Sequence, residues 1–273
     1  MSSNPAVEII RTDPPRGRFR AAIFDFDGTL SLLREGWPAV MSEMMLAELR
    51  RVGPEAGAAN DAELVEEIVV GLNGRPTIVQ MQTLAAEVIR RGGSADPMAL
   101  VREYQDRLFR LIGSRYDEIR SGRVSPKMWA VPGVHAFLDA LRARGIKLVL
   151  VSGTQVVHVR REAEMLGLLP YFGEAFFAPN GDDATFTKRA VIERVMAEHR
   201  LRGEELIGFG DGVVETEEVR RVGGVAVAVA SAEPPARGVN PGKRRRLIQA
   251  GADVVIGDYE CGDRLLALLF AEE

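Results

Sequence analysis

The chain has 273 residues, of which 46% are hydrophobic and 27% are charged, so it is long enough for one large globular domain or two modest ones. Its 35 Lys and Arg residues against 39 Asp and Glu residues give a net charge of −4, which does not favour a nucleic acid as partner. A single cysteine, Cys261, excludes an intramolecular disulfide, and no apolar run is long enough to cross a bilayer, so we expect a cytoplasmic protein that is not membrane-bound.

The first predicted strand is followed by a long helical region. The run RAAIFDF at 20–26 is apolar and typical of a buried strand. From about 34 to 125, four segments carry apolar residues at helical spacing, with no strand-like run between them: WPAVMSEMMLAELRRV, DAELVEEIVVGL, TIVQMQTLAAEVIRRG and PMALVREYQDRLFRLIGSRYDEI. We therefore predict an all-α insertion, residues 34–125, within a domain made of residues 1–33 and 126–273.

Beyond the insertion, short apolar strands alternate with amphipathic helices. Strands are predicted at 146–152, 204–211, 224–230 and 252–258, and the clearest helices at 133–145 and 188–199. A basic run, KRRR at 243–246, is predicted to be a solvated helix face. Continuous apolar strands that alternate with helices indicate a parallel sheet covered on both faces. The predicted fold class is α/β, a Rossmann-like doubly wound parallel sheet with the inserted helical domain.

Polar side chains close several of these strands. Asp25 and Asp27 follow the first strand, Ser152 closes the second, and Asp211 closes the third, while Lys188 opens a helix. Ligands of a parallel α/β sheet collect at the carboxyl ends of its strands, where all these groups are expected to meet. Carboxylates clustered in this way are suited to Mg²⁺, and a hydroxyl, an ammonium and backbone N–H groups near Gly153 are suited to phosphate oxygens.

These residues form four motifs in a fixed order: DFDGT, VSGT, TK and GDGVVE. Their order and their places on the predicted elements resemble the haloacid dehalogenase (HAD) superfamily of phosphohydrolases. The helical insertion directly after the first motif resembles the C1-type cap of subfamily I, which includes phosphoglycolate phosphatases and β-phosphoglucomutases.

The resemblance implies covalent catalysis. Asp25 would attack phosphorus and form an aspartyl-phosphate, and Asp27 would protonate the leaving alcohol and then activate water. Ser152, Gly153 and Lys188 would bind the phosphoryl oxygens. Dehalogenating members lack a carboxylate at the position of Asp27, because a halide needs no proton, so this residue favours a phosphate ester as substrate.

The resemblance also implies a Mg²⁺ ion, bound by Asp25, Asp211 and the main-chain carbonyl of Asp27. The fourth motif departs from the usual pattern, because Glu215 stands where a second Asp is common. The longer side chain favours contact with the metal through water, or contact with Lys188, over direct ligation.

The cap selects the substrate in this family, and a cap of this size favours a small soluble phosphate ester, such as a sugar phosphate or a phosphoglycolate-like acid. Trp37 and Arg75 are the first candidates for substrate contacts, although hinge packing for Trp37 and a solvated helix start for Arg75 are the favoured interpretations. No pattern in the sequence specifies an oligomeric state.

Three other interpretations remain open at this stage. DFDGTL by itself is also typical of a strand end followed by an Asx turn. A HAD-like protein that binds a phosphorylated ligand without catalysis would keep the fold, although the pair Asp25 and Asp27 argues against it. A phosphomutase of the β-phosphoglucomutase type would share both the motifs and the cap.

Overall fold

The computed structural model describes residues 7–52, 58–181, 183–232 and 238–270, and within them one seven-stranded sheet forms the centre of the molecule. The strand order is β1-β7-β6-β5-β2-β3-β4, and every pair is parallel except β1 with β7. The strands are β1 (Glu8–Ile9), β2 (Ala21–Phe24), β3 (Lys147–Val151), β4 (Phe176–Phe177), β5 (Leu206–Gly210), β6 (Val225–Val229) and β7 (Val254–Ile256). All five predicted strands are present. Strands β1 and β4 were not predicted, because they have two residues each and are too short to show a hydrophobic pattern.

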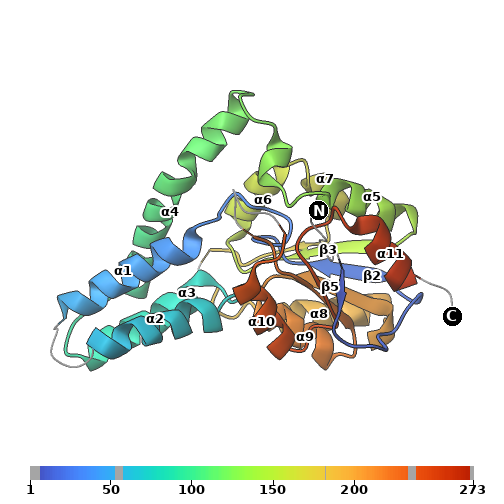
Figure 1. The fold of residues 1–273 in the computed structure, drawn as a ribbon. Helices are drawn as coiled ribbons and strands as arrows, with labels where there is room; N and C mark the ends of the chain where they lie inside the picture. Colours follow the sequence, from blue (N-terminus) through green and yellow to red (C-terminus); the bar gives the residue numbers. More distant parts are fainter. Residues whose placement is uncertain (1–6, 53–57, 182, 233–237, 271–273) are drawn as a thin grey trace.

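Helices cover both faces of this sheet (Figure 1). One face packs against α5 (Val134–Ala143), α6 (Val156–Met165) and α11 (Gly262–Phe270), and the other against α8 (Lys188–His199), α9 (Val213–Arg221) and α10 (Pro241–Gln249). Alternate strand residues point to opposite faces, so Phe24 lies in the first layer and Ile23 in the second. Three short helical turns complete this part of the chain: η1 (Pro126–Trp129), α7 (Leu169–Phe172) and η2 (Gly203–Glu205). The predicted doubly wound fold is confirmed.

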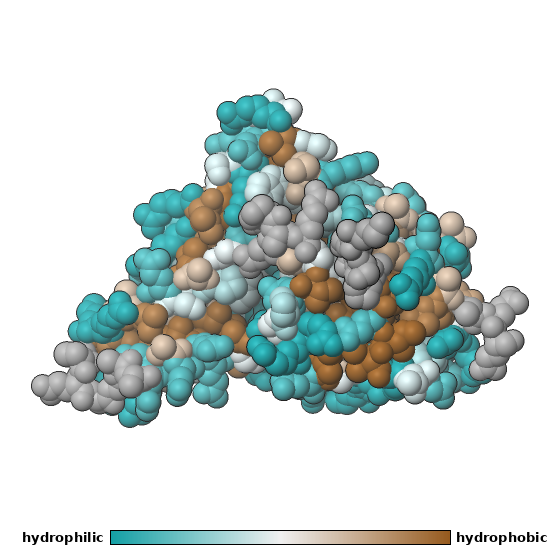
Figure 2. Space-filling view, viewed as in Figure 1, coloured by the Kyte–Doolittle hydropathy of each residue, from teal (hydrophilic) through white to brown (hydrophobic). Residues whose placement is uncertain are grey.

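Four helices between β2 and β3 form the cap, an arm that projects beside the sheet (Figure 1). They are α1 (Trp37–Arg51), α2 (Ala58–Gly71), α3 (Thr77–Arg90) and α4 (Pro97–Arg120), which pack mainly as the pairs α1 with α2 and α3 with α4. Buried side chains such as Met44, Met81 and Leu84 fill the space between them. The exposed surface of the cap in Figure 2 is mostly hydrophilic, with hydrophobic side chains showing along the seams between its helices. No described helix is long and apolar enough to cross a membrane.

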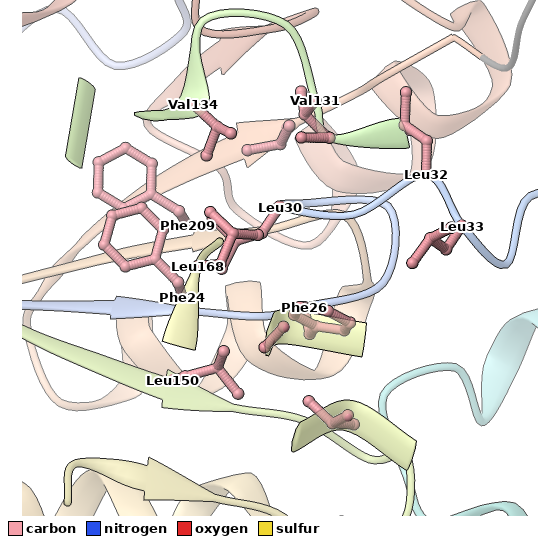
Figure 3. Packing of buried hydrophobic residues seen from close by; sticks show 14 of the residues in the cluster. Phe24, Phe26, Leu30, Leu32, Leu33, Val131, Val134, Leu150, Leu168 and Phe209 are labelled. Carbon is pink, nitrogen blue, oxygen red and sulfur yellow. The ribbon is translucent and has the colours of Figure 1, made fainter. Parts of the chain in front are cut away.

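Aromatic packing fixes the end of β2, which with β5 lies in the middle of the six parallel strands and is here called the central strand. The rings of Phe24 on β2 and Phe209 on β5 stack with centroids 4.5 Å apart, and Figure 3 shows Val134 above them and Leu30 beside them. The backbone N–H of Asp25 continues the ladder by donating to the carbonyl of Phe209 at 2.9 Å. The first residue after the strand therefore starts from a rigid, fully buried base.

The chain then turns sharply at Gly28. The N–H groups of Leu30 and Ser31 both donate to the carbonyl of Phe26, and Gly28 has a φ of +75°. A β-carbon at this glycine would lie 2.1 Å from Oδ2 of Asp211. Glycine is needed here both for the left-handed backbone and for the close approach of the carboxylate from β5.

Arg115 of α4 holds the segment that leads into the cap. Its Nη1 donates to the carbonyls of Leu33 at 2.7 Å and of Glu35 at 2.9 Å, and its guanidinium lies 4.7 Å from the ring of Trp129, on the segment that returns from the cap. Both chain crossings between sheet and cap are thereby tied to one side chain.

Replacing Phe24 with Ala should destabilise the sheet beneath the site. Phe24 is fully buried, so loss of its ring and the cavity that remains should lower the free energy of unfolding by about 3–5 kcal/mol in urea titrations. Met128→Ala is the control, because this side chain is 62% exposed and its loss should change stability by less than about 0.5 kcal/mol. Equal effects of the two substitutions would show that the Phe24 stack does not support the fold.

Candidate active site

Asp25 lies at the carboxyl end of the central strand in a small cluster of buried charges. The ammonium of Lys188 lies 2.8 Å from Oδ1 of Asp25 and 3.0 Å from Oε2 of Glu215. Burial raises the pKa of Asp25 well above its ordinary range, and the ammonium works against that rise. Burial alone would lower the pKa of Lys188, but the charges of Asp25 and Glu215 raise it, so the lysine stays protonated.

Lys188 is the first residue of α8, as the sequence predicted. Thr187 caps this helix by accepting a hydrogen bond from the N–H of Ala190 at 3.1 Å. A cation at a helix N-terminus is disfavoured by the helix dipole, and Lys188 is also only 3% exposed. Its position is therefore costly for the fold on its own and is compensated by the two carboxylates it contacts.

Asp211, which follows β5, forms an ion pair with a second lysine, Lys243. Nζ of Lys243 on α10 lies 3.0 Å from Oδ2 of Asp211 and donates to Oγ of Ser231 at 3.3 Å. Ser231 in turn donates to the carbonyl of Gly28 at 2.7 Å, next to the first motif. Burial raises the pKa of Asp211, and Lys243 opposes the rise. The prediction that 243–246 forms a solvated helix face is wrong for Lys243, because α10 begins at the sheet edge and directs this side chain at the site.

The cluster fits a divalent cation. Asp25, Asp211 and Glu215 each offer a carboxylate oxygen within 4.8 Å of the others, and all three side chains are buried. Burial, with the neighbouring carboxylates, raises the pKa of Asp25 and Asp211 more than the nearby lysines lower it. A hard cation that takes oxygen ligands, such as Mg²⁺, would supply further positive charge. Both oxygens of Glu215 already accept hydrogen bonds, from Lys188 at 3.0 Å and from the N–H of Gly212 at 2.5 Å.

Asp27 stands apart from this cluster and has different partners. Its Oδ2 accepts a hydrogen bond from the hydroxyl of Thr154 at 2.7 Å, and its Oδ1 lies 3.7 Å from Nε of Arg34. Burial raises the pKa of Asp27 to about 6, against the opposing effect of the Arg34 charge. The carboxyl can therefore be protonated or ionised close to neutral pH.

A buried network connects Asp27 to the cap. Arg34 donates to both oxygens of Glu162 on α6, at 2.6 Å from Nη2 and 2.9 Å from Nε, and the hydroxyl of Tyr116 on α4 donates to the same carboxylate at 2.6 Å. Glu162 is completely buried. Burial alone would lower the pKa of Arg34, but Glu162 and Asp27 raise it. The network therefore joins a cap helix, the entry to the cap and a core helix at one point.

The sequence did not identify Thr154, Arg34, Glu162 or Tyr116 as parts of this network. Thr154 lies inside the VSGT motif, and Arg34 lies at the predicted boundary of the insertion, so both could have been suspected. Glu162 and Tyr116 carry no local signal, because each lies in an ordinary helix and finds its partners only through the tertiary fold.

A cavity of about 60 Å³, here called the first cavity, brings the predicted residues together. From the core it is lined by Asp25, Asp27, Ser152, Gly153, Thr154 and Asp211. Ser152 is buried, and its Oγ accepts a hydrogen bond from the N–H of Thr154 at 3.1 Å.

The cap closes the other side of the first cavity. Trp37 and Arg75 both line it, as do Gln80 and Tyr104, which the sequence did not indicate. The loop between α2 and α3 lies against the second motif, since a β-carbon on Gly153 would lie 2.8 Å from the carbonyl oxygen of Arg75. Arg75 is exposed and its side chain has no partner among the described residues.

Comparisons with known proteins identify a family and several structures of similar fold. A family model described as haloacid dehalogenase-like hydrolase matches residues 19–223, more than half of the chain. None of the curated proteins matches. Among solved structures, a β-phosphoglucomutase from Clostridium difficile superposes with a TM-score of 0.57 at 13% identity, covering 91% of this chain and 99% of its own.

Two further structures are similar. A predicted phosphoglycolate phosphatase from Haemophilus somnus 129pt gives a TM-score of 0.54 at 18% identity, with 91% of this chain and 98% of that chain covered. A haloacid dehalogenase-like protein of unknown function from Agrobacterium tumefaciens gives 0.58 at 17% identity, with 92% and 98% covered. At these identities the likeness concerns the fold.

Replacing Asp27 with Asn should stabilise the metal-free protein at neutral and alkaline pH. The folded-state pKa of Asp27 lies at about 6, above the ordinary 3.8, so ionising this group costs the folded state stability as pH rises through that interval. Roughly two pKa units correspond to about 2–3 kcal/mol, absent near pH 4 and fully present above about pH 7. Urea unfolding of Asp27→Asn and wild type across this range measures the difference.

The matched control for this measurement is Asp106→Asn, which removes the same charge from an exposed position of α4. The control should show no growing difference from wild type with pH. A stability difference for Asp27→Asn that is the same at all pH values would show that Asp27 titrates normally in the folded protein.

Proposed function

Because the chain belongs to the haloacid dehalogenase-like hydrolases, we propose that it is a Mg²⁺-dependent phosphatase that hydrolyses a small phosphate monoester, such as a sugar phosphate or a phosphoglycolate-like acid. The observation that carries the proposal is the pair of neighbouring carboxyl groups with different partners. Asp25 forms an ion pair with Lys188. Asp27 accepts a hydrogen bond from the hydroxyl of Thr154, and burial raises the pKa of Asp27 to about 6. Two neighbouring carboxyl groups whose surroundings favour different protonation states are suited to the roles of nucleophile and acid–base catalyst.

In the first step, a carboxylate oxygen of Asp25 attacks phosphorus, and the bond from phosphorus to the ester oxygen breaks. Lys188, at 2.8 Å, favours the ionised form of Asp25 that this attack requires. The product is an aspartyl-phosphate and a free alcohol.

Asp27 supports both halves of the reaction. Its protonated carboxyl donates a proton to the departing alkoxide, and the resulting carboxylate then takes a proton from the water that attacks the aspartyl-phosphate. The hydroxyl of Thr154 fixes Oδ2 of Asp27, while Oδ1 lies beside Arg34 and accepts no hydrogen bond from the described residues.

Charge on the phosphoryl group is stabilised by Ser152, by the backbone N–H of Gly153 and by Lys188, which line or adjoin the first cavity. Asp25, Asp211 and the main-chain carbonyl of Asp27 would hold Mg²⁺, with Glu215 acting mainly through Lys188. When bound, the cation would offset the repulsion between the anionic carboxylate and the anionic phosphate.

The cap, for which we propose the boundaries 34–125, would act as a lid over this site. Trp37 and Arg75 line the first cavity and are proposed to contact the substrate. A closed site limits the leaving group to a small molecule and keeps bulk water from the aspartyl-phosphate. Such substrates are metabolites of the cytoplasm, where we expect the protein to act.

Asp25→Asn should abolish phosphate release from p-nitrophenyl phosphate in the presence of Mg²⁺, because an amide cannot attack phosphorus. A loss of at least about 10³-fold in kcat is expected for removal of a nucleophile. Asp106→Asn, which removes an exposed carboxylate, should keep the wild-type rate. If purified and folded Asp25→Asn retained a tenth of wild-type activity, another group would have to be the nucleophile.

Asp27→Asn should slow hydrolysis in a way that depends on the leaving group. For an alkyl ester such as glycerol phosphate, loss of general acid catalysis should lower kcat by about 10²–10⁴-fold. For p-nitrophenyl phosphate, whose phenolate leaves without a proton, the loss should be at least about ten-fold smaller. Equal losses for both esters would argue against proton donation by Asp27 in the first step.

A further inference from the structure

A second cavity of about 220 Å³ adjoins the first and is the larger of the two. It lies between the cap and α10, and it shares Asp27, Arg34, Trp37, Asn73 and Asp211 with the first cavity. No residue assigned a role in binding the phosphoryl group faces only the second cavity, which therefore needs another explanation.

The division of residues between the two cavities orients a substrate. Asp25, Ser152 and Gly153 line the first cavity and not the second, so under the proposed function the phosphoryl group occupies the first. Asp27, which donates the proton to the ester oxygen, lines both. That oxygen therefore lies at the boundary, and the remainder of the leaving group has the larger second cavity open to it.

The charged side chains that line the second cavity are three cations and three carboxylates. Apart from Asp27 and Asp211, its described charged lining consists of Arg34, Lys243, Arg246 and one carboxylate, Glu35. Arg34 is bound to Glu162 and lies beside Asp27, and Lys243 is bound to Asp211, so their charges are already balanced.

Arg246 differs from the other two cations. It lies three residues after Lys243 on α10, so both side chains are on the same face of the helix. It is partly buried, and no carboxylate pairs with it among the described residues. A guanidinium that lines a cavity without forming an ion pair is suited to a planar anion, which it can bind through two parallel N–H donors.

We propose that the second cavity holds the leaving group of the substrate and that Arg246 binds a second anionic group on it, a carboxylate or a second phosphate. Trp37, Val69 and Val70 form the apolar walls along which the carbon skeleton lies. The proposal rests on the proposed function and narrows it to phosphate monoesters that carry an additional negative charge.

Two competitors of p-nitrophenyl phosphate hydrolysis test the proposal: phosphoglycerate and glycerol phosphate, which differ in a carboxylate against a hydroxymethyl group. Wild type should bind phosphoglycerate at least about ten-fold more tightly, as measured by the two inhibition constants. In Arg246→Gln the ratio of the constants should fall to near one. Arg245→Gln, which removes an exposed charge from the next position, should keep the wild-type ratio.

Three results would overturn the proposal: no preference for phosphoglycerate in wild type, an unchanged ratio in Arg246→Gln, or a larger change in the ratio for Arg75→Gln than for Arg246→Gln. The last would place the anion in the first cavity, at the loop between α2 and α3. Failure of the proposed function itself would be distinct, because wild type would then release no phosphate from p-nitrophenyl phosphate in any assay.

Discussion

The structure depends on keeping three carboxylates buried together at the carboxyl edge of one sheet. Asp25, Asp211 and Glu215 lie within 4.8 Å of one another, and burying like charges at such distances costs several kcal/mol unless opposite charge is close. Lys188 and Lys243 provide part of that charge, each from the first turn of a helix that points at the edge. Three carboxylates face two lysines, so one negative charge stays uncompensated. A divalent cation would supply the missing positive charge.

The cap is joined to this site by charge as well as by hydrophobic packing. Arg34 at the entry to the cap lies beside Asp27 and is locked by Glu162 of the core and, through that carboxylate, by Tyr116 of α4. A buried charge pair tolerates little displacement, because separating its members leaves each one uncompensated. The position of the cap and the surroundings of Asp27 are therefore linked through one buried carboxylate.

Much of the fold was predictable because its signals are local. Strand β2 and the four cap helices are strongly patterned, and Asp25, Ser152, Lys188 and Asp211 follow strands or open a helix where the topology brings them together. Lys243 was misread because a basic run at a helix start looks the same whether it faces water or a carboxylate. Glu162 and Tyr116 were missed since their partners lie 128 and 46 residues away, and β1 and β4 because two residues give no period.

The central claim is that the carboxylate of Asp25, held by Lys188 at the end of the central strand, carries the phosphoryl group during turnover. The most direct measurement is mass spectrometry of peptides from protein quenched in acid within one turnover with p-nitrophenyl phosphate and Mg²⁺. The account predicts a peptide heavier by one phosphoryl group, with the modification on Asp25 and absent from Asp27. A phosphoryl group on any other residue, or none at any quench time while phosphate is released, would contradict it.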